Sequence, residues 1–419
     1  MRCVIQSHMG TTISMVNSFQ SNGSGDRTEE GMMRSRLALW ALIGVLLGLV
    51  LFVEAAPAGA PAAGKLRTIE EATCSNPLTL QEVEALLQQH RGKKMTFFSY
   101  GGALQTAQRE AFLKPFQERF GITVIEDSGS GLVARVRGAV DAKNVQWDIV
   151  HGNMTGVIAL GSGGYLEEMD CRVVDNRHFF DTVKTKWGAG GGISFSLVLA
   201  YREGVKKPSS WVDFWDVKNF PGQRGIQQWP GAVLEFGLMA AGYTPQQITF
   251  PLTAEQEELA FRKLEELAPN ISVFWASGSQ CPEMLLRKEL DYCTSYNGRI
   301  FDAQKQGAPL KVCWECGHVM NFDPLIIPKD APNKEIAQLF IAWTSFPEIN
   351  VRISKYISYG PTNKEAARLL PKEVDEKTLA ELSTSPKNLP HGIAEDQLWL
   401  GQNFDRINER HLKIFGQKK

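Results

Sequence analysis

The sequence lacks the short motifs that mark many enzyme active sites. It contains no Gly-X-Ser-X-Gly elbow, no His-Glu-X-X-His zinc motif and no Gly-X-Gly-X-X-Gly dinucleotide fingerprint. Its glycine-rich turns also lack the Gly-Lys-Ser/Thr ending of a nucleotide-binding loop. The histidines after residue 64 are isolated, and a lone histidine is usually structural. We therefore expect no catalytic residue, no metal and no cofactor, and a hydrolase with an unrecognised triad is the alternative.

The sequence also lacks an excess of charge of either sign. Its 419 residues carry 45 lysines and arginines against 46 acids, and no basic stripe is interleaved with aromatic residues. This composition does not favour binding to nucleic acid or to an anionic membrane. The chain has 43% hydrophobic and 22% charged residues, which is typical of a folded soluble protein. Its length allows two or three domains, or one large unit with two lobes.

The N-terminal region has a pattern typical of a secretory signal. Two arginines precede the apolar run 37–53, and an alanine-rich stretch follows at 55–64. We interpret residues 32–63 as a signal peptide and residues 1–31 as a non-native or disordered extension. The signal predicts export to the periplasm. An uncleaved membrane anchor is the alternative, because the apolar run is slightly long for a signal.

Six cysteines remain beyond the predicted signal: Cys74, Cys171, Cys281, Cys293, Cys313 and Cys316. An even number in an oxidising compartment is compatible with disulfides, but the pairing does not follow from the spacing. The pair Cys313 and Cys316 also has the spacing found in zinc and redox sites. We favour a disulfide or buried thiols over zinc, because only His318 lies close by as a further ligand.

Strand-like and helix-like segments alternate in the first third of the mature chain. Predicted strands at 94–100, 122–126 and 147–150 alternate with predicted helices at 105–120 and 132–140. The connections are short, so the pattern indicates a parallel α/β sheet with helices on both faces.

The rest of the chain continues this pattern. We expect a glycine-rich crossing segment at 187–192, strands at 193–202, 290–296, 312–315 and 322–327, and helices at 259–267, 298–306 and 334–345. No linker separates two domains, which favours two α/β lobes that exchange strands.

Candidate binding residues stand where predicted strands end or helices begin, because parallel sheets bind ligands outside the carboxyl ends of their strands. Small residues there let a ligand approach the backbone, and polar groups fix its orientation. His151 and Arg299 also follow predicted strands. The candidates are Tyr100, Gly101, Asp127, Ser128, Asn153, Trp275, Ser277, Tyr296 and Asn297.

Rings and acids near these turns favour a cationic ligand. An organic ammonium is held by ring faces together with a carboxylate. The rings in loops or at strand ends are Trp229, Trp275, Tyr296, Trp314 and Tyr359. The nearest acids are Asp127, Glu235, Glu315 and Asp323. The alternative for each ring is a place in the core of a lobe.

Five segments resemble the spermidine/putrescine-binding subfamily of bacterial extracellular solute-binding proteins. The resemblance covers roughly residues 93–415 and is carried by SYGGALQTAQREAFLKPFQERFGI, PSSWVDFWDVKNFPGQRGI, SYNGRIFDAQKQGAPL, NFDPLIIPKDAPNKEIAQLFIAW and YGPTNKEA. It implies the type II periplasmic-binding-protein fold, with two α/β lobes of mostly parallel sheet, a hinge and a ligand between them. We expect lobe 1 at 64–192, lobe 2 at 193–316, and a return to lobe 1 with C-terminal helices at 317–419.

The resemblance also implies a role and partners. The protein would capture a small amine and deliver it to the permease subunits of an ABC importer, without catalysis and as a monomer. The expected ligand is a polyamine such as putrescine or spermidine. In the subfamily pattern, the ligand-binding positions are matched here by Glu235, Tyr296, Asp323 and Tyr359.

Three positions depart from the subfamily pattern. Ala232 stands where a second acid is usual, Asn321 where a tryptophan is usual, and Thr155 where a tyrosine is usual. A long polycation would meet fewer carboxylates here, so a smaller amine or an amino-acid-like zwitterion is the alternative ligand. A ferric-ion binder is a further alternative. Such binders usually present adjacent tyrosines, whereas Tyr356 and Tyr359 are separated.

Overall fold

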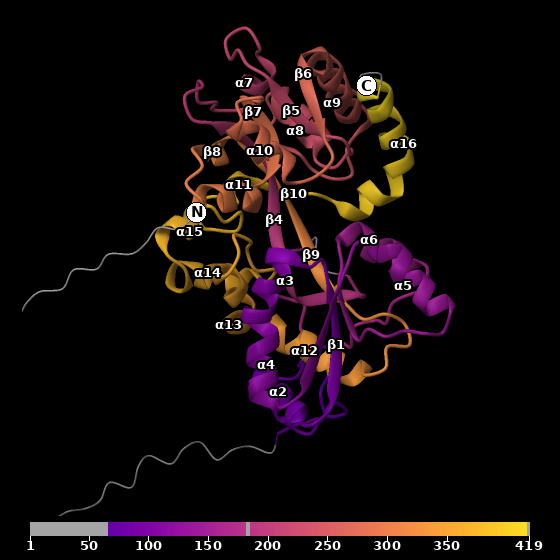
Figure 1. Cartoon of the computed structure of the whole chain (residues 1–419). Coiled ribbons are helices and arrows are strands. Elements are labelled where there is room, and N and C mark those ends of the chain that lie inside the picture. The colour runs from indigo at the N-terminus through magenta and orange to yellow at the C-terminus, as the bar shows by residue number, and fades with distance from the viewer. Residues whose placement is uncertain (1–65, 182–184, 417–419) are drawn as a thin grey trace, which may run out of the picture. The chain divides into compact units, whose positions relative to one another are not determined.

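The computed structural model describes residues 66–181 and 185–416, so the predicted signal peptide and extension lie outside the described residues. One sheet runs through the described chain in the order β2-β1-β3-β9-β4-β7-β5-β6, with β10 beside β9 and β8 beside β4. Figure 1 shows β4 and β9 passing between two groups of helices and strands. These two groups are the two lobes.

Lobe 1 starts with three parallel strands, as the alternation predicted. They are β1 (Lys94–Ser99), β2 (Thr123–Ser128) and β3 (Ile149–His151). The helices are α2 (Leu80–Gln88), α3 (Gly102–Gln108), α4 (Lys114–Phe120), α5 (Leu132–Asp141) and α6 (Met154–Ser162). A π-helical turn at Arg109–Leu113 joins α3 to α4, so the predicted helix 105–120 is one continuous helical run.

The two long strands β4 (Gly188–Arg202) and β9 (His318–Ile326) are antiparallel and connect the lobes. Gly188 pairs with Ile326 in lobe 1, and Leu197 pairs with Val319 near lobe 2. The glycine-rich segment expected to precede a strand is therefore itself part of β4. The register shifts between Ala189 and Ile193. The backbones of β4 and β9 approach so closely there that a Cβ atom on Gly192 would lie 1.9 Å from the carbonyl oxygen of Asp323.

Lobe 2 contains β5 (Arg224–Gln227), β6 (Ile271–Trp275), β7 (Tyr292–Tyr296) and β8 (Leu310–Val312). β6 and β7 flank β5 in parallel, whereas β7 and β8 are antiparallel to β4. The helices are α7 (Trp211–Trp215), α8 (Val233–Ala240), α9 (Ala254–Leu267), α10 (Gln280–Leu286) and α11 (Asn297–Lys305). The predicted strand 312–315 was wrong beyond Val312, where a 3₁₀ helix (Trp314–Cys316) follows.

Two hydrophobic cores fill the lobes. Segments 72–193 and 320–382 build the first, and segments 197–319 and 393–415 build the second. The first core includes α12 (Lys334–Ser345), α13 (Pro347–Asn350) and α14 (Lys364–Glu373). We expected the C-terminal helices to return to lobe 1. The buried apolar residues of β10 (Gly392–Ala394) and α16 (Gln397–Phe415) instead join the second core, in lobe 2. Arg406 and Arg410 of α16 pair with Glu257 and Glu258 of α9, which fixes that packing.

Two disulfides resolve the pairing that the sequence left open. Cys74 bonds to Cys171, and Cys313 bonds to Cys316. Cys281 and Cys293 are free and buried. Within the described residues there is no group of three or more histidines, cysteines or acids placed to hold a metal. No helix in residues 66–181 or 185–416 has the length and apolar character needed to cross a membrane.

Candidate functional site

Two adjoining cavities lie along the crossing strands. The first chamber has a volume of about 460 Å³, and its lining includes Gly101, Leu104, Ile193, Arg299, Asp302 and Tyr359. The second chamber has a volume of about 400 Å³, and its lining includes Asn153, Thr155, Trp229, Asn321, Glu395 and Gln397. Tyr100, Phe195, Tyr296 and Asp323 line both chambers. The two chambers are therefore parts of one cleft, with Asp323 where they meet.

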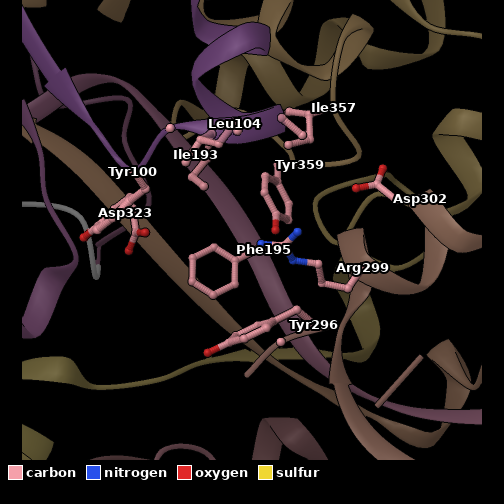
Figure 2. Close-up of a pocket in the computed structure, with 14 residues that line it drawn as sticks. Tyr100, Leu104, Ile193, Phe195, Tyr296, Arg299, Asp302, Asp323, Ile357 and Tyr359 are labelled. Carbon is pink, nitrogen blue, oxygen red and sulfur yellow. The ribbon is translucent and has the colours of Figure 1, made fainter. Parts of the chain in front are cut away.

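The first chamber presents opposite charges on different elements. Asp323 belongs to β9, whereas Arg299 and Asp302 belong to the first turns of α11. Figure 2 shows Asp323 beside Tyr100 on one side of the chamber and Arg299 on the other. Burial raises the pKa of Asp302, and the charges of Lys305 and Arg299 oppose this shift. The chamber can therefore offer a carboxylate and a guanidinium to one ligand.

Asp323 is mostly enclosed, with 14% of its side chain exposed. Burial raises the pKa of its carboxyl group, because the ionised form loses hydration. The neighbouring His151 opposes this shift: its Nε2 lies 3.7 Å from Oδ2 of Asp323. An ammonium group that entered the chamber would supply a positive charge beside this carboxylate.

Aromatic rings form the walls between the charged groups. Phe195 of β4 packs edge-on against Tyr296, with ring centroids 5.6 Å apart, and its centroid lies 5.8 Å from that of Tyr359. Tyr296 also stacks on Trp229 of the second chamber at 6.1 Å. Burial raises the pKa of Tyr100 and of Tyr359 to about 12, so both hydroxyls are neutral near pH 7. Ring faces of this kind attract an ammonium group.

The polar groups of the second chamber mostly bond to each other. Thr155 Oγ1 donates to Gln397 at 2.6 Å, and Gln397 Nε2 donates to Asn321 at 2.8 Å and also to Glu395. Glu395 accepts the backbone N–H of Ala232 at 2.7 Å. Hydrogen bonds that are already satisfied leave little for a ligand to gain. The second chamber therefore offers a ligand few unsatisfied polar groups.

Two buried acids interact with each other near the second chamber, Glu235 and the lining residue Glu395. Burial, together with the nearby carboxyl group of Glu395, raises the pKa of Glu235 to about 8. Burial also raises the pKa of Glu395, to about 7. Glu235 lies on α8 and lines neither chamber, whereas Glu395 lines the second. The pair holds protons near neutral pH that the unfolded chain would have lost.

We expect the free energy of unfolding to fall as pH rises from 6.5 to 8. In this window the folded chain keeps protons on Glu235 and Glu395, whose pKa values exceed the ordinary 4.5, while the unfolded chain has already released them. Stability then falls by about 1.4 kcal/mol per pH unit for each extra proton held. Glu235→Gln should at least halve this slope in urea unfolding, because it removes one acid and the repulsion on the other.

The lower limit of the window follows from two buried histidines. Burial lowers the pKa of His318 and of His411 to about 4, so these groups make stability rise with pH up to about 6.5. Glu118→Gln, on the exposed side of α4, is the control and should keep the wild-type slope. A wild-type stability that stays flat or rises between pH 6.5 and 8 would contradict the prediction.

The structure brings six of the twelve candidate residues to the cleft: Tyr100, Gly101, Asn153, Tyr296, Asp323 and Tyr359. Asn153 caps α6 through the backbone N–H of Gly156, and it donates to the hydroxyl of Tyr100 at 3.2 Å. Strand ends of β1 and β7 place Tyr100 and Tyr296.

The other six candidates do not line either chamber. Glu235 and Trp275 are buried, and the indole N–H of Trp275 bonds to Thr294. Asn297 is also buried; it accepts the N–H of Ser196 and donates to the carbonyls of Ser358 and Glu381. Asp127, Ser128 and Ser277 are exposed outside the lining. The carboxylate of Asp127 accepts the indole N–H of Trp147 instead.

Sequence reasoning missed several lining residues. Arg299 was named as following a predicted strand but was not among the twelve candidates. Phe195 lies inside β4, and its inward direction depends on strand pairing. Glu395 and Gln397 follow β10 near the C-terminus, and no motif marks them. They reach the cleft because β10 adds to β9.

The comparisons with known proteins agree with this architecture. Residues 111–381 match the family model of bacterial extracellular solute-binding proteins. A gamma-aminobutyric acid-binding protein of Pseudomonas aeruginosa is 34% identical over 330 residues, covering 78% of this chain and 92% of the relative. A spermidine/putrescine-binding periplasmic protein of Escherichia coli is 30% identical over 185 residues, covering 44% of this chain and 51% of the relative. The structure of an ABC transporter substrate-binding protein from Bradyrhizobium japonicum has a TM-score of 0.70 at 30% identity, covering 77% of this chain and 99% of that chain.

Proposed function

Since the chain belongs to the bacterial extracellular solute-binding proteins and serves as the substrate-binding component of an ABC transporter, we propose that its ligand is a small ω-amino acid of the 4-aminobutyrate type. We further propose that the protein is exported to the periplasm, acts without catalysis and hands this ligand to the permease subunits.

One observation carries the ligand class: Asp323 and Arg299 line the same chamber from different lobes. A zwitterion can place its ammonium at Asp323 and its carboxylate at Arg299. Both ends of the ligand then lose water only where an opposite charge replaces it. A linear ω-amino acid carries its charges at its two ends, which suits a chamber whose charged groups stand on opposite sides.

Arg299 also opposes the polyamine that the resemblance led us to expect. A diamine would bring its second ammonium toward a guanidinium, and like charges brought together in an enclosed site cost several kcal/mol. The second chamber offers a diamine little compensation, because Glu235 does not line it and burial raises the pKa of its acid Glu395 to about 7. The relative named as a gamma-aminobutyric acid-binding protein supports a ligand of this class.

Calorimetry with 4-aminobutyrate and putrescine tests the proposal, because the two ligands have similar length and differ at one end. We expect 4-aminobutyrate to bind at least about 100-fold more tightly, since like-charge repulsion penalises putrescine. Arg299→Met should weaken binding of 4-aminobutyrate about 10- to 150-fold, the scale of a hydrogen bond to a charged group, and leave or improve binding of putrescine.

Arg287→Met provides the matched control, because Arg287 is exposed at the end of α10 and lies outside both chambers. Its affinity for both ligands should equal that of the wild type. Tighter binding of putrescine than of 4-aminobutyrate by the wild-type protein would overturn the proposal and return a polyamine as the ligand.

A further inference from the structure

A chain of three buried polar side chains ends at Asp323. Ser99 Oγ at the end of β1 donates to Gln108 Oε1 at 2.7 Å, and Gln108 Nε2 lies 2.7 Å from His151 Nδ1. None of the three residues has any exposed surface. His151 ends β3, and its Nε2 faces Oδ2 of Asp323 at 3.7 Å with no other partner in the described part of the chain. The chain therefore leads from the interior of lobe 1 to the acid of the cleft.

The order of these bonds determines which nitrogen of His151 carries hydrogen. The oxygen of the Gln108 amide accepts from Ser99, so its NH₂ group faces Nδ1 of His151. Nδ1 then accepts, and a neutral imidazole carries its hydrogen on Nε2, the nitrogen that faces Asp323. The opposite order would turn a lone pair on Nε2 toward a carboxylate oxygen, which would place two acceptors against each other.

We propose that His151, oriented by Gln108, is a positioning residue that holds Oδ2 of Asp323 and leaves Oδ1 for the ammonium group of the ligand. The separation of 3.7 Å exceeds a hydrogen bond by about half an ångström, which a small rotation of the carboxylate closes. The inference rests on the proposed function only in assigning an ammonium to Asp323.

The same histidine also supports a wall of the cleft. The ring of Tyr100 packs edge-on against His151, with centroids 5.5 Å apart and an interplanar angle of 77°. Tyr100 lines both chambers. His151 therefore contacts two residues of the cleft while remaining out of reach of solvent itself. A buried donor in this place opposes the effect of burial on the pKa of Asp323.

Two substitutions separate positioning from packing. Glutamine at 151 can place its amide N–H where Nε2 stands, but it removes the acceptor for Gln108. Asparagine can place its amide oxygen where Nδ1 stands, so it keeps the bond to Gln108 and loses the donor to Asp323. We expect His151→Gln to keep affinity for 4-aminobutyrate within about threefold and to lower the melting temperature, because a buried N–H of Gln108 is left unpaired. We expect His151→Asn to weaken binding about 10- to 100-fold, as loss of a hydrogen bond to a charged group does.

A measurement without ligand keeps this test independent of the proposed function. Carboxyl-carbon NMR titration, with Asp323→Asn as the assignment control, should show a higher pKa for Asp323 in His151→Asn than in the wild type or His151→Gln. The groups that face Asp323 are His151 from β3, Tyr100 after β1, Tyr296 at the end of β7 and Tyr359 before α14, and burial raises the pKa of all three tyrosines.

The outcomes are distinct. Failure of the wild type to bind 4-aminobutyrate would reject the proposed ligand, and the titration would still decide the role of His151. An unchanged pKa of Asp323 in His151→Asn would overturn the positioning role. Losses of affinity that follow the melting temperature in both variants would also overturn it, because they would show that His151 acts only through packing.

Discussion

Replacement of Asp323 by asparagine is expected to weaken binding of 4-aminobutyrate by about 2–5 kcal/mol, because truncating one partner of a buried charge pair leaves the other charge uncompensated. Stability without ligand should stay unchanged or rise. Burial raises the pKa of Asp323, which shows that the site disfavours an ionised carboxylate when no cation is present. Calorimetry and urea unfolding of the same variant measure both effects.

The opposite behaviour of affinity and stability is what identifies a ligand-binding role. Asp127→Asn is the matched control, since Asp127 is an exposed acid outside both chambers. Its affinity should equal that of the wild type. Unchanged affinity together with a lowered melting temperature in Asp323→Asn would instead identify Asp323 as part of the scaffold.

Alanine in place of Gly192 is expected to destabilise the protein by about 3 kcal/mol or more, at or above the upper end of the range for overpacking. The added Cβ atom would lie 1.9 Å from the carbonyl oxygen of Asp323 and 2.9 Å from Cα of Pro324. Both atoms belong to the backbone of β9, which is paired with β4, so no flexible side chain can yield. Affinity should fall as well, because the displaced backbone carries the carboxylate of Asp323.

Gly401→Ala supplies the control for this prediction. Gly401 lies inside α16, and no atom stands within 4 Å of the Cβ that alanine would add. Alanine there should stabilise the protein by about 0.5–1 kcal/mol through helix propensity. In urea unfolding, the free energy of unfolding should therefore fall for Gly192→Ala and rise for Gly401→Ala. Equal stability of Gly192→Ala and the wild type would contradict the prediction, because β4 and β9 would then move apart without lowering the free energy of unfolding.

Local patterns predicted much of the first lobe. The apolar runs and helical spacing of residues 94–150 correctly gave three parallel strands and the helices between them, because period and turn residues are local properties. The rule that ligands bind at the ends of parallel strands then brought Tyr100 and Asn153 to the cleft. The same rule at β7 brought Tyr296.

Other candidates lie outside the cleft, because the direction of a side chain depends on residues that are distant in the sequence. Glu235 matched a ligand-binding position, but all residues of α8 are buried, and Glu235 lines neither chamber. Asn297 follows a strand as predicted, yet its amide is used by backbone groups 61 and 84 residues farther along the chain. A strand-end rule identifies where a residue stands and not which way its side chain turns.

The amino-acid sequence by itself determined the family, the α/β class and the alternation of strands and helices, since these depend on periodicity and on motifs along the chain. Only the tertiary structure decided which charges share a chamber. Asp323 and Arg299 stand 24 positions apart on separate elements, and their common chamber arises from the antiparallel crossing of β4 with β9 and β7. The ligand class depends on that pairing of opposite charges, because an enclosed charge must meet its counter-charge in space and not in sequence.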